Sequence, residues 1–389
     1  MRYRAVVGAV SPRGKGEGAV YRRSDNLWAA SIELPPRDGK RRRKVVSAKT
    51  KAEVLRKLHE AKKLLESRGD IHTDTLTVAQ WFDVWMRDIA TKTRRPKTVA
   101  SYRSVVDRWV VPTIGKTRLD KVSPSTIRRV FTAMETEGKS TTYMRNAHGI
   151  MSAAFKDAER EGRIQRNPVE LVHAPRKAAT NLHALTPDEA ATLLDLFSET
   201  PEGALWATFI LTGARRGEVL GLEWDRVGDV IDLSWQLQRI TAGAPLPQGF
   251  EHRHLTDGFH LTRPKTRAGW RVIPLVDPLK SILDRYRALV PENPHGLVFA
   301  RPDGSPFDPD YVTKLWPQIR EAAGIDKNVR VHDLRHTTVD LLYAAGVDET
   351  DIQQIVGHSS RAMSRAYKSQ AAVERLRESM LRVSKSLER

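Results

Sequence analysis

Five short motifs in the C-terminal half of the chain have the residue types needed to act on a phosphate ester. In chain order, they are residues 212–218 with Arg215, residues 264–266 with Lys265, residues 332–337 with His332 and Arg335, residues 357–360 with His358, and Tyr367. Arginine binds phosphate oxygens through paired hydrogen bonds, and lysine and histidine transfer protons. The chain has no cysteine, so covalent chemistry needs an oxygen or nitrogen nucleophile, for which Tyr367 is the best-placed candidate.

Each motif taken alone also has a purely structural explanation. Arg215 with Glu218 three residues later is more often an ordinary ion pair, and a lysine such as Lys265 after a turn is ordinarily just exposed. His332 and Arg335 are three residues apart, which places both on one face at the start of a helix. The combination of all five motifs in one half of the chain favours catalysis.

The charge of the chain is unevenly distributed along its 389 residues. The net charge is +18, of which residues 1–70 carry +11, residues 71–180 carry +9 and residues 181–389 carry −2. A general solubility charge would not stop near residue 180, so the first half is predicted to bind a nucleic-acid backbone. No apolar run is long enough to cross a membrane and no signal peptide is evident, so we expect a cytoplasmic protein without a membrane partner.

The first predicted domain, residues 1–70, is a three-stranded antiparallel sheet backed by one helix. Strands are predicted at residues 19–22, 27–34 and 42–47, and Thr50 with Glu53 has the spacing of a helix-opening capping box. The basic residues of this sheet are Arg22, Arg23, Lys40, Arg41, Arg42, Arg43 and Lys44. We expect them to share one face that binds DNA as a β-ribbon does, the alternative being a solvated hairpin.

The second predicted domain, residues 71–178, is all-α. Helices are expected from Thr77 and over residues 96–112, 123–137 and 140–161, with aromatic stripes that belong to the core. The basic residues expected on the DNA-facing surface of these helices are Arg94, Arg95, Lys97, Arg128, Arg129, Lys139 and Arg145.

The third predicted domain, residues 179–389, is mainly α with a small antiparallel sheet. Strands are expected within residues 228–240, 260–262 and 270–275, and residues 241–259 are expected to form an extended loop. His252, His254 and His260 suggest a zinc site, but no cysteine or carboxylate stands at a diagnostic spacing, so no metal site is predicted and imidazoles near DNA are favoured. Residues 371–387 form an amphipathic stretch.

The five motifs, in their order and spacing, resemble those of the tyrosine recombinases, the integrases of temperate phages and integrative plasmids. The shared elements are Thr-Gly-Ala-Arg-Arg-Gly-Glu, Pro-Lys-Thr, His-Asp-Leu-Arg-His-Thr, Gly-His-Ser-Ser and the tyrosine that follows. An arm-binding domain, a helical core-binding domain and a catalytic domain are also the layout of this family. Two departures are mild: Val356 stands where leucine is more frequent, and Ser364 where threonine is.

The resemblance implies a role for each motif residue. Arg215 and Arg335 would bind the non-bridging oxygens of the scissile phosphate, and Lys265 would protonate the departing 5′-oxygen. The residues that would support Arg215 are Glu218, Gly213 and Gly217. Neither a metal nor ATP would be needed, because the cations neutralise the charge that a metal otherwise handles.

The resemblance also implies the reaction and its partners. Tyr367 would attack phosphorus to form a 3′-phosphotyrosyl ester, with His332 as its acid/base partner and His358 hydrogen-bonded to the phosphate. Four protomers on two duplexes would exchange strands through a Holliday junction, integrating or excising a phage or mobile element in the bacterial cytoplasm or nucleoid. The partners implied are core and arm sites in double-stranded DNA, a tetramer of this chain, an excision factor and a host DNA-bending protein. The amphipathic stretch 371–387 could close on its own domain or dock on a neighbouring protomer, and the resemblance favours the second.

Three other functions fit parts of the sequence. A DNA-binding regulator with the same fold would have lost catalysis, yet all six catalytic residues are present. A type IB topoisomerase uses the same phosphotyrosine chemistry on one duplex, but the arm-like N-terminal module favours recombination. An RNA-binding protein needs exposed aromatic platforms, whereas Trp81, Trp85 and Trp109 fit core stripes.

Overall fold

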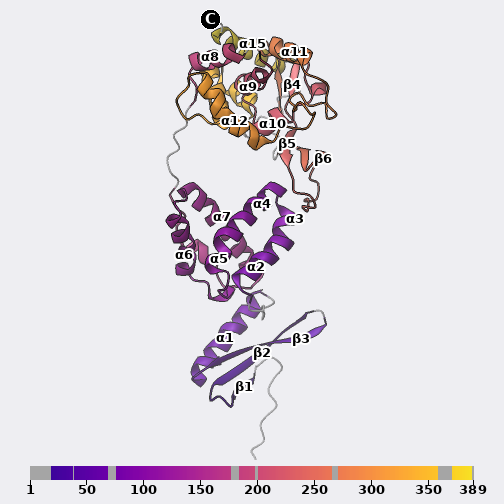
Figure 1. Cartoon of the computed structure of the whole chain (residues 1–389). Coiled ribbons are helices and arrows are strands. Elements are labelled where there is room, and N and C mark those ends of the chain that lie inside the picture. Colours follow the sequence, from indigo (N-terminus) through magenta and orange to yellow (C-terminus); the bar gives the residue numbers. More distant parts are fainter. Residues whose placement is uncertain are drawn as a thin grey trace, which may run out of the picture. The chain divides into compact units, whose positions relative to one another are not determined.

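The computed structural model of the chain describes residues 19–37, 39–68, 76–176, 184–197, 200–264, 270–357 and 370–387, which are drawn as coloured ribbons in Figure 1. These described residues form three separate hydrophobic cores. The chain divides into two compact units, residues 1–90 with 98–178 and residues 91–97 with 179–389. The three domain boundaries inferred from the sequence stay a prediction.

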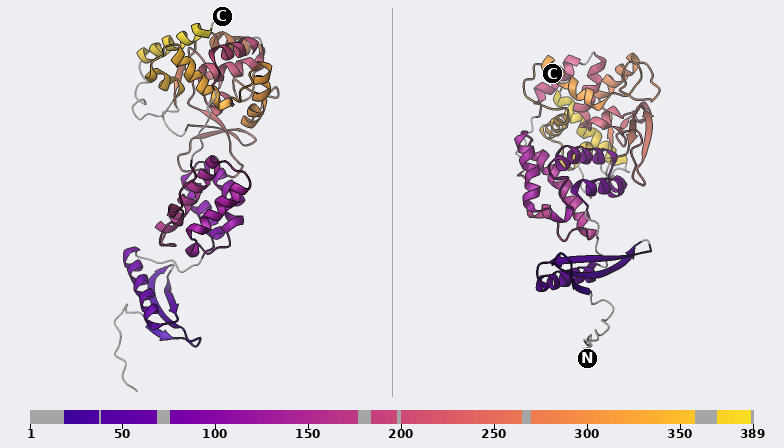
Figure 2. Two further views of the ribbon diagram at one scale, coloured as in Figure 1. Left: turned by 90° about the vertical axis from the view of Figure 1, so that its left-hand side faces the viewer. Right: turned by 60° about the horizontal axis from the view of Figure 1, so that its bottom comes forward.

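The N-terminal part is the predicted sheet with one helix. Strands β1 (Ala19–Arg22), β2 (Trp28–Arg37) and β3 (Lys40–Ala48) are antiparallel in the order β1-β2-β3, and α1 (Lys51–Arg68) lies along one face (Figure 2). Thr50 Oγ1 accepts a hydrogen bond of 3.2 Å from the Glu53 amide, as the capping spacing predicts. Val54 and Leu58 of α1 are buried against the sheet and form its core.

The basic run of β3 is divided between the two faces of this sheet, which corrects the expectation of a single basic face. Cross-strand partners point to the same side of a sheet. Arg42 pairs with Leu34 and Lys44 with Ile32, and both apolar partners are buried on the α1 side. Burial lowers the pKa of Lys44. Because side chains alternate along a strand, the residues on the open face are Arg41 and Arg43.

The helical part follows the predicted apolar periodicity. Its α-helices are α2 (Val78–Trp85), α3 (Thr91–Thr93), α4 (Pro96–Val105), α5 (Val111–Ile114), α6 (Pro124–Thr136) and α7 (Thr141–Arg160). Two π-helical turns, Met86–Ala90 and Val106–Val110, continue α2 and α4. Thr77 and Gln80 form a capping box with bonds of 3.3 and 2.9 Å. Trp81, Trp85 and Trp109 are buried, which confirms that the aromatic stripes are core.

The C-terminal part is a helical domain with two small antiparallel sheets. Its α-helices are α8 (Pro187–Phe197), α9 (Pro201–Thr212), α10 (Arg216–Leu220), α11 (Leu279–Leu289), α12 (Pro309–Ala322), α13 (Leu334–Ala344), α14 (Glu349–Val356) and α15 (Gln370–Leu387). One sheet pairs β4 (Val230–Asp232) with β8 (Val272–Pro274). The other has the order β5 (Gln236–Arg239), β7 (Phe259–Thr262), β6 (His252–Thr256). Among the described helices, none is long and apolar enough to cross a bilayer.

Strand β6 corrects the prediction that residues 241–259 form only an extended loop. It pairs with β7 through the tight turn at Asp257 and Gly258, whose φ angles are 43° and 78°. An Asp-Gly pair with positive φ at both residues is typical of a two-residue hairpin turn. The residues of β6 are mostly polar and did not predict a strand, whereas the Asp257-Gly258 dipeptide indicates a hairpin turn.

Helix α15 packs on its own domain in this single chain, and docking on a neighbouring protomer stays a prediction. Leu376, Met380 and Val383 belong to the core of the C-terminal part, where α15 contacts β8 and α13. Arg375 Nε donates to Asp351 Oδ1 at 2.7 Å, which fixes the start of the helix to α14. The apolar face of α15 therefore completes the core of its own chain.

Candidate active site

The turn between α9 and α10 brings the first motif against two later segments of the chain. Gly213 ends α9 in the left-handed region with φ 58°. A Cβ atom there would lie 3.1 Å from the Thr338 side chain and from Val356 Cγ1, so only glycine fits without strain. At Gly217 a Cβ atom would lie 2.9 Å from the Leu237 carbonyl oxygen, so a side chain would push α10 away from β5. The two glycines thus allow the close approach of these segments.

Arg215 is held by Glu218 from inside the protein. Its Nη1 donates to Glu218 Oε1 at 2.7 Å, and its backbone amide donates to Glu218 Oε2 at 2.8 Å. Its Nη2 donates to the Gly357 carbonyl at 3.2 Å. The Arg215 side chain remains 40% exposed whereas that of Glu218 is 1% exposed, so the guanidinium is fixed from behind and open to solvent on the other side.

Arg271 is a second cation on Glu218 that the sequence did not single out. Its Nη1 lies 3.0 Å from Glu218 Oε2, and its side chain is fully buried. Burial alone would raise the pKa of Glu218, but the charges of Arg271 and Arg215 and the hydrogen bonds from Arg215 lower it below its ordinary value. Glu218 is therefore an ionised carboxylate between two guanidinium groups.

Arg335 lies in the first turn of α13, and its side chain reaches the turn between α9 and α10. Its Nη1 donates to the Gly213 carbonyl at 2.7 Å, and its side chain is buried. Its Nη2 is also buried and has no hydrogen-bond partner in the described part of the chain. Burial, together with the charges of Arg271 and Arg215, lowers the pKa of Arg335 to about 9. A free donor in such an electropositive place favours an anion.

His332 lies directly before α13, in the turn Val331–Asp333. Partial burial and the nearby charges of Arg335 and His336 lower the pKa of this imidazole. Asp333 is buried and paired with Arg330 at 2.8 Å, which holds the start of α13. His332 is therefore a neutral ring at neutral pH and accessible to solvent.

Of the six predicted catalytic residues, the structure describes three and brings them together. Arg215, His332 and Arg335 surround the Gly213 turn. The other three, Lys265, His358 and Tyr367, lie outside the described residues.

The basic residues predicted to bind DNA lie mostly at the surface. Those exposed are Arg22, Arg23, Lys40, Arg41, Arg43, Arg94, Lys97, Arg128, Arg129 and Arg145. Those partly buried are Arg42, Lys44, Arg95 and Lys139. Arg22 pairs across the strands with Trp28, on the α1 side of the sheet. The contact of these residues with DNA stays a prediction.

The three histidines of the β6–β7 hairpin gather on one face. The ring centroids of His252 and His254 lie 5.4 and 4.9 Å from that of His260. Burial and the two neighbouring imidazoles lower the pKa of His260. Within the described ranges, no group of three or more His, Cys, Asp or Glu residues has the geometry to hold a metal ion.

Arg215 and Arg271 on one buried carboxylate, with Arg335 on the neighbouring Gly213 carbonyl, make a cationic site that favours an anion. Comparison with known proteins gives the family of the chain. Residues 183–374 match the phage integrase family, and residues 77–135 match the phage integrase N-terminal SAM-like domain. The chain belongs to the phage integrase family and is a tyrosine-type site-specific recombinase.

Individual relatives match over most of their length. An integrase from Saccharopolyspora erythraea is 26% identical, over 90% of this chain and 92% of the relative. The Tn1549 transposon integrase in complex with a circular intermediate DNA has a TM-score of 0.62 at 21% identity, over 79% of this chain and 99% of that one. A lambda integrase tetramer bound to a Holliday junction has a TM-score of 0.55 at 18% identity, over 88% and 96%. The two solved structures share the fold of this chain.

The lowered pKa of His332 gives a prediction for the pH dependence of strand cleavage. A pKa below the ordinary 6.5 keeps the ring neutral, and able to accept a proton, throughout the neutral range. We expect the single-turnover cleavage rate to stay level from pH 8 to about pH 6.5 and to fall below it. His332→Asn should remove this acid limb, because the amide does not titrate. An acid limb with a midpoint above pH 6.5 that disappears in His332→Asn would contradict the lowered pKa of His332.

Proposed function

We propose that this recombinase cuts and rejoins DNA through Tyr367, with Arg215 and Arg335 bound to the scissile phosphate. The observation that carries the proposal is the pair of guanidinium groups at the Gly213 turn. Arg215 is held by Glu218 with one side open, and Arg335 keeps a buried Nη2 without a partner among the described residues. Two fixed arginines of this kind bind the two non-bridging oxygens of a phosphodiester.

The proposed reaction is an exchange of one phosphoester for another. The Tyr367 oxygen forms a bond to phosphorus and gives its proton to the neutral His332. The bond from phosphorus to the 5′-oxygen breaks, and Lys265 protonates that oxygen, leaving a 3′-phosphotyrosyl ester and a 5′-hydroxyl. His358 hydrogen-bonds the phosphate. A 5′-hydroxyl from a partner strand then attacks the ester and restores the DNA.

The proposed chemistry uses no metal and no ATP. The charge that develops on the phosphate is met by the guanidinium groups of Arg215 and Arg335, which are fixed before the substrate arrives. The energy of the broken bond is kept in the tyrosyl ester, so rejoining needs no further energy source.

The proposed assembly is a tetramer of this chain on two duplexes. The lambda integrase relative is a tetramer bound to a Holliday junction, and the Tn1549 relative binds a circular intermediate DNA. By analogy, this chain integrates or excises a phage or other mobile element in the bacterial cytoplasm or nucleoid. An excision factor and a host DNA-bending protein are further proposed partners.

The basic first half of the chain is proposed to hold the DNA. Residues 1–70 would bind accessory arm sites, and residues 71–178 would bind the core sites beside the cleavage position. The exposed cations of both parts and the charge of +20 over residues 1–180 support this division.

The nucleophile can be tested directly. We expect the wild type, incubated without metal or ATP with DNA that flanks its own gene, to form an SDS-resistant, protease-sensitive adduct. Tyr367→Phe lacks the attacking oxygen and should form none while binding DNA as tightly. An adduct with both proteins would move the nucleophile elsewhere. Tight, salt-sensitive binding without an adduct from either protein would favour the DNA-binding regulator.

The acid role of Lys265 can be tested with a better leaving group. Lys265→Ala should slow cleavage of normal DNA by about 100-fold or more, because the 5′-oxygen then leaves without a proton. A 5′-bridging phosphorothiolate should restore most of the rate, since sulfur leaves with little protonation. Equal loss on both substrates would refute the role.

The division of the basic run of β3 predicts which of its cations meet the DNA backbone. Arg41→Gln with Arg43→Gln removes two cations of the open face and should reduce the salt slope of duplex binding by about 2. Arg42→Gln with Lys44→Gln removes the same charge on the α1 side and should change the slope less. The slopes come from fluorescence anisotropy titrations at several salt concentrations. The opposite ranking would place the DNA on the α1 side.

A further inference from the structure

Arg271 is a fully buried arginine that belongs to none of the five motifs. It directly precedes β8, and its side chain has no exposed surface. An arginine is rarely buried unless it is paired, because taking its charge out of water costs several kcal/mol. Its partners therefore indicate what it does.

The guanidinium of Arg271 joins two segments of the active site. Its Nε donates to the Ile355 carbonyl at 2.7 Å, in the last turn of α14, and its Nη1 lies 3.0 Å from Glu218 Oε2. Glu218 holds Arg215, whose Nη2 returns to the Gly357 carbonyl, two residues after Ile355. These contacts close a ring from Arg271 through Glu218 and Arg215 to the end of α14 and back.

The ring holds three parts of the site that are distant in sequence. Arg215 and Glu218 are at the start of α10. Ile355 and Gly357 are three residues and one residue before the motif residue His358, and Arg271 is six residues after Lys265. Arg271 connects these segments through one hydrogen bond from Nε and one ion pair from Nη1, and the single ammonium group of lysine cannot reproduce both contacts.

The charge of Arg271 also contributes to the electrostatic potential of the site. Arg215 and Arg271 pair with the carboxylate of Glu218, and Arg335 binds the neighbouring Gly213 carbonyl, so these four side chains have a formal charge of +2. The charge of Arg271 contributes to the lowered pKa of Arg335. Because Arg271 is buried, it raises the positive potential at the phosphate site without reaching DNA.

We propose that Arg271 is a positioning residue for strand cleavage: it locks Glu218 and the end of α14 so that Arg215 faces the scissile phosphate. This inference rests on the proposed binding of the phosphate by Arg215 and Arg335.

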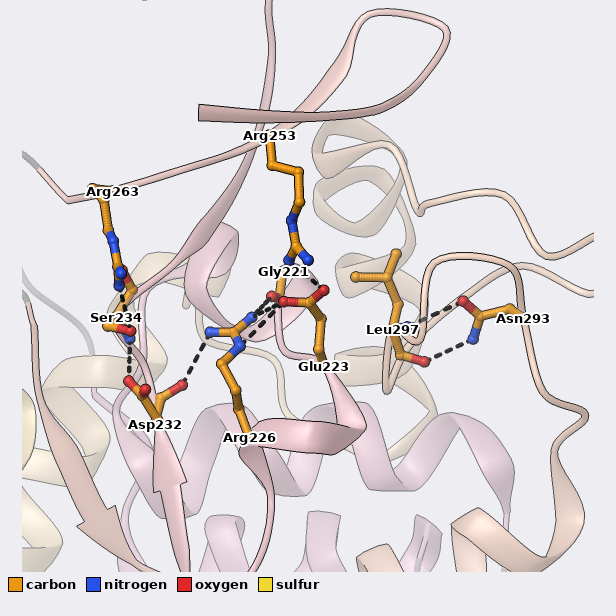
Figure 3. A network of polar contacts seen from close by, with 9 residues as sticks. All are labelled: Gly221, Glu223, Arg226, Asp232, Ser234, Arg253, Arg263, Asn293 and Leu297. Carbon is orange, nitrogen blue, oxygen red and sulfur yellow. Dashed lines mark hydrogen bonds and ion pairs between the residues drawn. The ribbon is translucent and has the colours of Figure 1, made fainter. Parts of the chain in front are cut away.

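A second, largely buried arginine of the same domain provides a matched control. Arg226 donates to Glu223 at 2.9 Å and to the carbonyls of Gly221 and Asp232 at 2.5 and 3.2 Å, and Glu223 also pairs with Arg253 (Figure 3). Its side chain is 11% exposed. The Arg226 network thus has the same chemistry as that of Arg271, but these contacts lead neither to Arg215 nor to α14.

The experiment compares Arg271→Met and Arg271→Lys with Arg226→Met and Arg226→Lys in the full-length protein. The substrate is a half-site built on the cleavage position found with the wild type. It carries either the normal phosphate or a methylphosphonate, in which a methyl group replaces one non-bridging oxygen and removes the charge. Three quantities are measured for each variant: the melting temperature, the half-site affinity and the single-turnover rate of adduct formation.

We expect Arg271→Met to slow adduct formation on the phosphate about 100-fold, with half-site affinity within about 3-fold of the wild type. The loss should be much smaller on the methylphosphonate, which has less charge for misplaced arginines to neutralise. Arg271→Lys keeps the charge but cannot span both partners, so its loss should be about 10-fold. The Arg226 variants should lower the melting temperature without changing the ratio of the two rates.

Two results would overturn the inference. One is equal loss of rate on both substrates in the Arg271 variants, as for a merely structural residue. The other is a wild-type rate for Arg271→Lys and Arg271→Met on the phosphate. If Arg271→Met does not fold, the inference is judged from Arg271→Lys, by the ratio of its rates on the phosphate and on the methylphosphonate. Tyr367→Phe is run in parallel: an adduct from that variant would refute the proposed function itself, whereas its absence with unaffected Arg271 variants would refute only this inference.

Discussion

Glu218 is the one buried carboxylate on which the geometry of the described site depends. Both of its oxygens accept hydrogen bonds from Arg215, its Oε2 also lies 3.0 Å from Arg271 Nη1, and its side chain is almost completely out of solvent. A buried carboxylate is tolerated only when its charge is matched and its lone pairs are filled. Arg215 fills the lone pairs, and the charge is matched by cations from two different parts of the chain. The requirement to satisfy Glu218 therefore fixes the α9–α10 turn relative to the start of β8.

The site is built from helix ends, where backbone groups lack partners within the helix. The carbonyls of Gly213 and Gly357, which follow the last residues of α9 and α14, receive Arg335 and Arg215. Each arginine thus donates to a carbonyl at a helix terminus. Arg335 keeps a buried Nη2 without a partner among the described residues, and the Arg215 side chain stays 40% exposed. Close packing of Thr338 against Gly213 brings α13 near enough for Arg335 to reach the Gly213 carbonyl. The same contacts that end the helices also set the distance between the two arginines.

The positive charge of residues 1–180 and that of residues 181–389 differ in amount and in setting. Among the described residues up to 176, most of the cations predicted to bind DNA are exposed, where they attract a polyanion over long range. In residues 181–389 the net charge is close to zero. Of the cations at the described site, Arg271 and Arg335 are buried, and Arg215 is held by Glu218. A buried cation acts at short range in a medium that screens it little, which suits stabilisation of one phosphate rather than capture of a duplex. Burial and then the charge of Arg335 lower the pKa of His332 beside these cations.

The sequence by itself determined the family, the order of the motifs and most of the helices, because apolar periodicity, capping residues and short motifs are local signals. It also contained the Asp-Gly signal of the β6–β7 turn, which the polar residues around it obscured. Only the tertiary structure decided that the basic run of β3 divides between two faces, that α15 packs on its own domain, and that Arg271 completes the site. The physical reason is that burial and pairing depend on residues far away in the chain: Arg271 meets Glu218 and Ile355 only once β8, α10 and α14 have packed together.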